Sequence, residues 1–169
     1  MSHNATTGFT VEVTLSKNAL SGANLEGAKL EGINLHRAVL NGADLVGADL
    51  IYADLERADL SGAKLIGALL DNADLSGADL NVANLSNAHL TNANLQSANL
   101  RFARLDEAYL ADANLRKAIL TDANLSEADL RGGKFKDADL TGSTGINLAG
   151  VNAKQITPPA GYKLVKVKD

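Results

Sequence analysis

The amino-acid sequence predicts an all-β solenoid, in which a four-sided coil winds around a core of leucine side chains. The first observation is a pattern, A-x-L-x-x, that runs from 23 to 140 for 24 units without an insertion. The second is that five residues advance ~140° around an α-helix and reverse the facing of side chains along a strand, so neither element suits this period. The third is that like residues recur at a lag of 20, as Gly27, Gly47 and Gly67 do. A chain that turns after every leucine, four times per coil, satisfies all three.

The Ala and Leu positions define the predicted core. Two residues that lie two apart share one side of a short extended segment, so both point toward the axis of the coil. The leucine position departs from Leu once, at Phe135, and the alanine position departs twice, at Ile33 and Gly133. Twenty-four units at four per coil give about six coils. The leucine position at successive coils predicts these core residues: Leu45, Leu65, Leu85, Leu105 and, on another side, Phe135.

The two residues after each leucine are predicted to form a corner. The second of them is where a type II turn needs positive φ, which Gly and Asn tolerate. Between 22 and 142 this residue is Gly or Asn at 13 of 25 corners. We expect other turn types at the rest, such as Arg57, Phe102 and Glu127. The Asp or Asn before many leucines, such as Asp44, is expected to hydrogen-bond neighbouring backbone.

Both ends of a solenoid expose its core, so caps are predicted on either side of the repeats. Residues 1–22 are interpreted as an N-terminal cap with a strand and degenerate first repeats, and 23–142 as the repeat domain. Residues 143–169 hold repeats shifted in frame and then a tail that Pro158 interrupts. The tail is expected either to cover the last coil or to mediate a dimer. The chain is therefore predicted to be a monomer, or a dimer through its C-terminal end.

Individual units such as A-D-L-S-G (73–77) and A-N-L-S-E (123–127) resemble the pentapeptide-repeat family. The family's consensus is a small residue, Asp or Asn, Leu or Phe, and two polar residues, and the resemblance covers 23–142. It implies a right-handed quadrilateral parallel β-helix, and it implies no single activity; a bacterial-type protein is the default expectation. Some members resemble duplex DNA in width and charge and protect DNA gyrase from quinolone-type drugs, so gyrase binding is one alternative function.

Composition limits the classes of partner and compartment. The chain has 169 residues, a formal net charge of −4 and no cysteine. The acidic balance disfavours a general affinity for nucleic acid or anionic lipid, and thiolate chemistry is excluded. The first residues lack the features of a secretory signal, and no apolar run is long enough to span a membrane. We expect a cytoplasmic protein; a lumenal or periplasmic location stays open if a leader has been removed.

Candidate catalytic residues do not form any constellation in this sequence. His3, His36 and His89 are far apart, and the many Asp residues occupy one repeat position, which favours a structural role. A convex rod also has no cleft that could exclude water from a catalytic site and position its residues. The sequence predicts a non-enzyme with no catalytic, cofactor-binding or metal-binding residues.

Surface pattern is the remaining source of functional information. Sorted by position modulo 20, the side that begins at 33 carries a net charge of +2, whereas each of the other three carries −3. Apolar residues at a lag of 20 predict an exposed strip, with Val82 beside Phe102 as a smaller candidate. The strip is a possible partner-binding site and consists of Val46, Ile66, Leu69, His89 and Tyr109.

These surfaces predict a rigid, non-catalytic scaffold that binds an unidentified protein partner and neither nucleic acid nor membrane. The gyrase alternative is weighed by charge. Duplex DNA carries one charge per ~1.7 Å, so ~29 Å of it, the length of six coils at ~4.8 Å, would hold ~17 negative charges. The repeat region has a net charge of −7, the sum of +2 and three times −3. The repeat region would therefore imitate duplex DNA with far too few negative charges.

Overall fold

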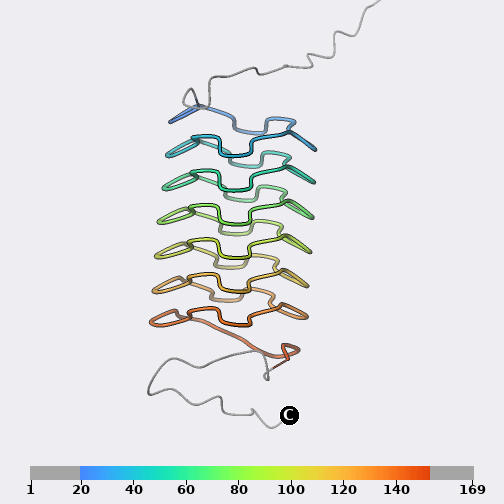
Figure 1. Cartoon of the computed structure of the whole chain (residues 1–169), viewed down its shortest axis with the longest axis vertical. Coiled ribbons are helices and arrows are strands. Elements are labelled where there is room, and N and C mark those ends of the chain that lie inside the picture. The colour runs from blue at the N-terminus through green and yellow to red at the C-terminus, as the bar shows by residue number, and fades with distance from the viewer. Residues whose placement is uncertain (1–19, 153–169) are drawn as a thin grey trace, which may run out of the picture.

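The chain winds into a straight rod of stacked coils, as Figure 1 shows from the blue to the red end. The computed structural model describes residues 20–152. Within that range each bridge joins residues 20 apart in parallel, from Asn24↔Asp44 to Asn124↔Thr144. These are isolated one-residue bridges, and residues 20–152 contain no longer strand and no helix. The predicted four-sided parallel coil is confirmed. The predicted end segments are 1–22 and 143–169, and of these 1–19 and 153–169 lie outside the described residues.

Four corners per coil divide the surface into four sides. Corner 1 is formed by the turn residues 46–47 and their equivalents at steps of 20, and corners 2, 3 and 4 follow at 51–52, 56–57 and 61–62. Between two corners, one outward residue precedes the leucine and forms the bridge to the next coil. A residue's position modulo 20 therefore states where it lies on the rod.

All five backbone N–H groups from Asp44 to Ala48 donate hydrogen bonds. Around Asp44, the N–H of Asp44 donates to the Ala23 carbonyl at 2.9 Å, and the N–H of Leu45 donates to the Lys64 carbonyl at 2.7 Å. The N–H of Gly47 donates to the next coil, and that of Ala48 closes the turn onto the Leu45 carbonyl at 3.0 Å. The fifth, the N–H of Val46, donates to the Asp44 side chain at 3.3 Å. The expected role of this Asp or Asn is confirmed, because it satisfies a donor that the ladder leaves over.

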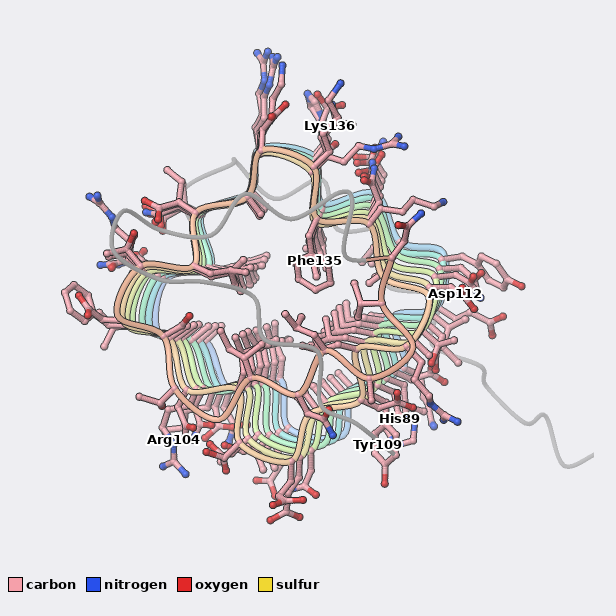
Figure 2. All side chains as sticks on the ribbon, turned by 90° about the horizontal axis from the view of Figure 1, so that it is seen from below. His89, Arg104, Tyr109, Asp112, Phe135 and Lys136 are labelled. Atoms are coloured by element: carbon pink, nitrogen blue, oxygen red, sulfur yellow. The ribbon has the colours of Figure 1, made fainter. Side chains whose placement is uncertain are left out.

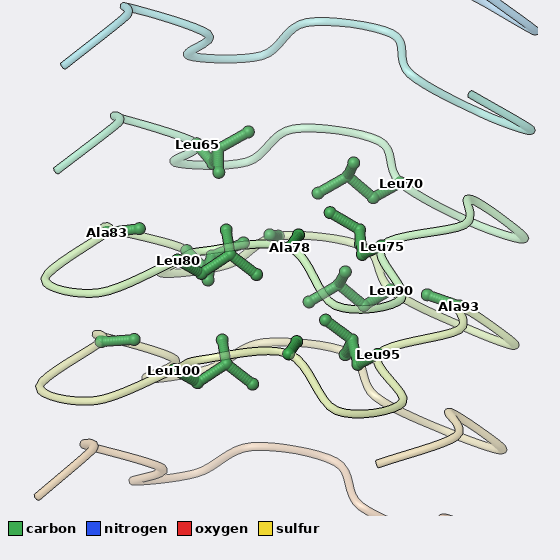
Figure 3. Packing of buried hydrophobic residues seen from close by; sticks show 14 of the residues in the cluster. Leu65, Leu70, Leu75, Ala78, Leu80, Ala83, Leu90, Ala93, Leu95 and Leu100 are labelled. Atoms are coloured by element: carbon green, nitrogen blue, oxygen red, sulfur yellow. The ribbon is translucent and has the colours of Figure 1, made fainter. Parts of the chain in front are cut away.

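The core is a column of leucine on each side of the rod, with alanine beside it. All five predicted core residues have no exposed surface: Leu45, Leu65, Leu85, Leu105 and Phe135. Figure 3 shows leucines of successive coils directly above one another, as at Leu80 and Leu100. Because the interior of the coil is narrow, there is room for only a methyl group beside each leucine, which explains why alanine recurs two residues before it.

The corners differ from the sequence-based expectation. All 25 turn residues between 22 and 142 have positive φ, fifteen of them non-glycine. Arg57, Phe102 and Glu127, predicted to use other turns, have φ of 56°, 56° and 59°. That prediction was wrong. The ladder on both neighbouring coils imposes one corner geometry, so a residue that disfavours the left-handed region is held in it.

Val82 is the least suited of these turn residues, because it is β-branched, has φ 59° and is 58% exposed. Replacing Val82 with Asn is expected to raise the free energy of unfolding by about 1 kcal/mol, since Asn tolerates the left-handed region. Denaturant unfolding measures the change. The reverse substitution at another corner, Asn87→Val, should lower it by a similar amount. A loss of stability in Val82→Asn would contradict this account.

The predicted shift of frame after 142 is a missing corner. Thr144 still bridges to Asn124, and a turn of the same kind closes at Leu148, where the N–H of Val151 donates to its carbonyl at 3.0 Å. Between them the chain crosses corner 1 without its two turn residues. Gly145, with φ 69°, makes the crossing, because a Cβ there would overlap the backbone of Ser126. The shortcut therefore requires glycine.

Candidate functional site

The predicted apolar strip lies on the side of the rod between corners 1 and 2. Leu69 bridges to His89, and His89 bridges to Tyr109, so the three occupy one column on consecutive coils. The rings of His89 and Tyr109 stack with centroids 4.7 Å apart and planes tilted by 33°. Figure 2 shows both side chains at the same place on the outside of the coil. The structure thus brings together the central residues of the strip.

The other two strip residues lie at the adjacent corner 1. Val46 and Ile66 are equivalent turn residues on consecutive coils. The two coils are joined there by a hydrogen bond from the Gly47 N–H to the Ile66 carbonyl at 2.9 Å. Tyr109 and Ile66 are exposed to 47% and 37%, and Val46, Leu69 and His89 are half-buried. The strip therefore presents partial rather than full exposure, with Tyr109 as its most accessible residue.

Sequence reasoning missed one neighbour of the strip, Tyr52, which is 62% exposed at corner 2. It borders the same side of the rod as Leu69, one coil nearer the N-terminus. Its position modulo 20 was the signal that could have found it. The smaller candidate pair, Val82 and Phe102, is 58% and 56% exposed on consecutive coils at corner 4. That pair lies away from the strip.

Carboxylates border the strip at both corners. Corner 1 contributes Asp106 below Ile66, and corner 2 contributes Asp71 and Asp112 beside Leu69 and Tyr109. Burial on its own would raise the pKa of Asp106, but hydrogen bonds from Arg104 and Ser86 outweigh it and the pKa lies below its usual value. Asp71 accepts the Thr91 N–H at 3.0 Å. The strip is thus an apolar centre with an anionic rim.

Three further carboxylates on the rod form hydrogen bonds or ion pairs with other residues of the repeat region. The side chain of Lys64, 3.0 Å away, lowers the pKa of Asp44, and that of Arg131, 2.6 Å away, lowers the pKa of Asp129. Hydrogen bonds from Thr141 lower the pKa of Asp139. A lowered pKa keeps a carboxylate ionised at neutral pH, whereas a general acid needs a raised one. None of these three groups is suited to that role.

The histidines remain apart. His36 lies at corner 3, with Nδ1 3.5 Å from Glu56 and 3.9 Å from Asp54, whereas His89 belongs to the strip. His3 lies outside the described residues. Across 20–152, no group of three or more His, Asp or Glu side chains is placed to hold a metal ion. The same part of the chain contains no helix with the length and apolarity to cross a membrane.

Comparison with known proteins places these features in context. A family model described as pentapeptide repeats matches the chain in overlapping segments that together run from 20 to 144. Among curated proteins, no significant match to this chain was found.

Solved structures share the repeat. HetL, a pentapeptide repeat protein involved in heterocyst differentiation regulation in the cyanobacterium Nostoc, is 42% identical over 73% of this chain, with a TM-score of 0.39. This chain spans 60% of the length of HetL. A second Nostoc pentapeptide repeat protein is 42% identical over 56% of this chain and 83% of its own, with a TM-score of 0.50.

A more distant structure is QnrB1, a plasmid-mediated fluoroquinolone resistance protein, 22% identical over 72% of this chain and 70% of its own, with a TM-score of 0.38. An identity this low shows a shared fold alone. The comparisons confirm the right-handed quadrilateral β-helix.

Proposed function

Since this chain belongs to the pentapeptide-repeat family, which its repeats match from 20 to 144, we propose that it is a non-catalytic scaffold whose apolar strip binds a protein partner. The observation that carries the proposal is the column of Leu69, His89 and Tyr109 on three consecutive coils. The repeat places Asp or Asn at most positions of this kind, and those residues satisfy a backbone donor. Three departures in succession on one side form a continuous surface instead of scattered exceptions.

The chemistry of the strip describes the partner that would fit it. An apolar centre of Ile66, Leu69 and Tyr109 matches an apolar patch, and the anionic rim at Asp71 and Asp112 matches Lys or Arg around that patch. The rod offers this surface without rearrangement, because each strip residue sits on a hydrogen-bonded coil. A rigid surface loses little conformational freedom on binding.

The gyrase alternative requires a mimic of duplex DNA, and the charge of the rod does not support one. The repeat region has a net charge of −7, and one of its four sides is positive. Duplex DNA of the same length would carry ~17 negative charges on all sides. The likeness to QnrB1 reflects the shared coil.

The test compares partner capture by the wild-type chain with capture by a double variant, Leu69→Asp with Tyr109→Asp. Capture of the partner from extracts of the native host should fall at least about tenfold, because two carboxylates replace the apolar centre of the contact. Quantitative mass spectrometry of the captured proteins measures the loss. The variant should fold, since Asp occupies the same column at Asp49 and Asp129.

A matched control makes the same change on another side. Val39→Asp with Ile119→Asp also replaces two apolar residues that precede a leucine, between corners 3 and 4. Proteins that the control retains and the strip variant loses are partners of the strip. If the strip variant captures the same proteins as wild type in the same amounts, the strip is not the binding site.

A further inference from the structure

A cluster of cations at corner 3 is a second interaction surface, separate from the strip. It consists of the corner residues Arg116 and Lys117 on one coil and Lys136 on the next, together with Lys134, the outward residue just before that corner. The two coils are hydrogen-bonded there, with the Lys117 N–H donating to the Lys136 carbonyl at 2.9 Å and Asn114 bridging to Lys134. All four side chains are exposed. Figure 2 shows nitrogen-ended side chains projecting outward around the labelled Lys136.

Among the described residues, these four cations differ from most others in forming no salt bridge. Lys29, Lys64, Arg104 and Arg131 each lie within 4.0 Å of a carboxylate oxygen. In the described part of the chain, no salt bridge involves any member of the cluster. Asp137, beside Lys136, is the carboxylate on these two turns, so the four positive charges and this one negative charge give the cluster a local net charge of +3.

We propose that the corner 3 cluster, Arg116, Lys117, Lys134 and Lys136, binds a short acidic segment of a protein. Unpaired guanidinium and ammonium groups on a rigid corner attract carboxylates and can hydrogen-bond them directly. The cluster spans two coils, ~4.8 Å apart, so its footprint suits a few residues of extended chain.

Charge elsewhere on the rod selects this partner over nucleic acid. The other three sides each carry −3, and the whole chain carries −4. A nucleic acid is a dense polyanion that extends beyond two coils, and it would meet these acidic sides. A short acidic peptide is held at one corner and avoids them. The cluster and the strip lie on different sides, so this proposal does not depend on the strip.

The direct test measures binding of a fluorescent octaglutamate peptide by anisotropy at about 50 mM salt, where screening is weak. The test variant takes its residues from equivalent positions of an earlier coil: Arg116→Gln, Lys117→Ser, Lys134→Asn and Lys136→Gln reproduce Gln96, Ser97 and Asn94. Because those residues already fit the repeat, the variant should fold. We expect its affinity for the peptide to fall about tenfold or more, because the modest binding free energies of several exposed charge pairs add up.

A control variant removes four cations elsewhere: Lys29→Gln, Lys64→Asn, Arg104→Asn and Arg131→Thr. Its net charge equals that of the test variant, and its affinity should stay within about twofold of wild type, because the cluster is intact. An equal loss in both variants would show that only net charge matters and would overturn the proposal. So would absence of peptide binding by the wild-type chain.

Two further probes distinguish the source of negative charge. A single-stranded oligo-dT and vesicles containing phosphatidylserine are titrated under the same conditions. The proposal expects weaker binding to both than to octaglutamate. Tighter binding to either would overturn the assignment to an acidic protein segment. The proposal that the strip binds a protein partner would not be affected by that result.

Discussion

Replacing Leu85 with alanine is expected to lower the free energy of unfolding by about 2–5 kcal/mol, near the upper end of that range. Leu85 has no exposed surface and lies in a column between Leu65 and Leu105. The cost of such a substitution depends on how far the surroundings collapse into the space left behind. Here the coils are held apart by the ladder, in which the Leu85 N–H donates to the Arg104 carbonyl at 2.7 Å. The cavity therefore stays open.

The same substitution near the end of the rod provides the control. Leu30 is partly buried at the first described coil, so Leu30→Ala removes fewer contacts and should cost less than half as much. Guanidinium unfolding followed by circular dichroism measures both variants. Equal losses at Leu85 and Leu30 would contradict the view that the closed leucine column is the main source of stability.

Replacing Gly133 with alanine should lower the free energy of unfolding by about 1–3 kcal/mol, although alanine is the usual residue at this position. A Cβ on Gly133 would lie 2.8 Å from Cε2 of Phe135 and 3.0 Å from the Leu130 carbonyl oxygen. Phe135 has no exposed surface, so its ring has little room to shift. The two exceptions to the repeat in this unit are thus one adjustment, in which the missing methyl makes room for the ring.

A double-mutant cycle tests this coupling. Phe135→Leu restores the usual residue and leaves space beside Gly133, so Gly133→Ala should cost little or nothing in that background. We expect a coupling of about 1–3 kcal/mol between the two sites, measured by chemical unfolding. Additive effects would mean that the ring and the glycine are independent.

Much of the fold could be predicted because the period of five leaves one solution. Residues that recur at this spacing share a side only if the chain turns after each leucine, and the lag of 20 fixes four turns per coil. The core at Leu45 and Leu85 follows from that argument alone. The column of Leu69, His89 and Tyr109 follows as well, since position modulo 20 places residues on the surface.

The corners could not be predicted in the same way. Local preference indicates a left-handed residue at Gly22 or Asn72 but not at Arg57 or Phe102. Each of these residues adopts the same conformation because hydrogen bonds to the coil before and the coil after outweigh its local preference. Tyr52 was missed although its position modulo 20 places it beside the strip, because no apolar residue at the same corner of the next coil drew attention to it.

By itself, the sequence determined the winding of this protein: its four sides, its leucine core and the register that stacks one coil on the next. It could do so because these features repeat, and a repeated signal accumulates along the chain. Only the tertiary structure decided which cations at the corners lack partners, which turn residues are held in an unfavourable conformation, and why Gly133 and Gly145 must be glycine. Those features depend on atoms of neighbouring coils, 20 residues away in sequence, whose distances no local pattern contains.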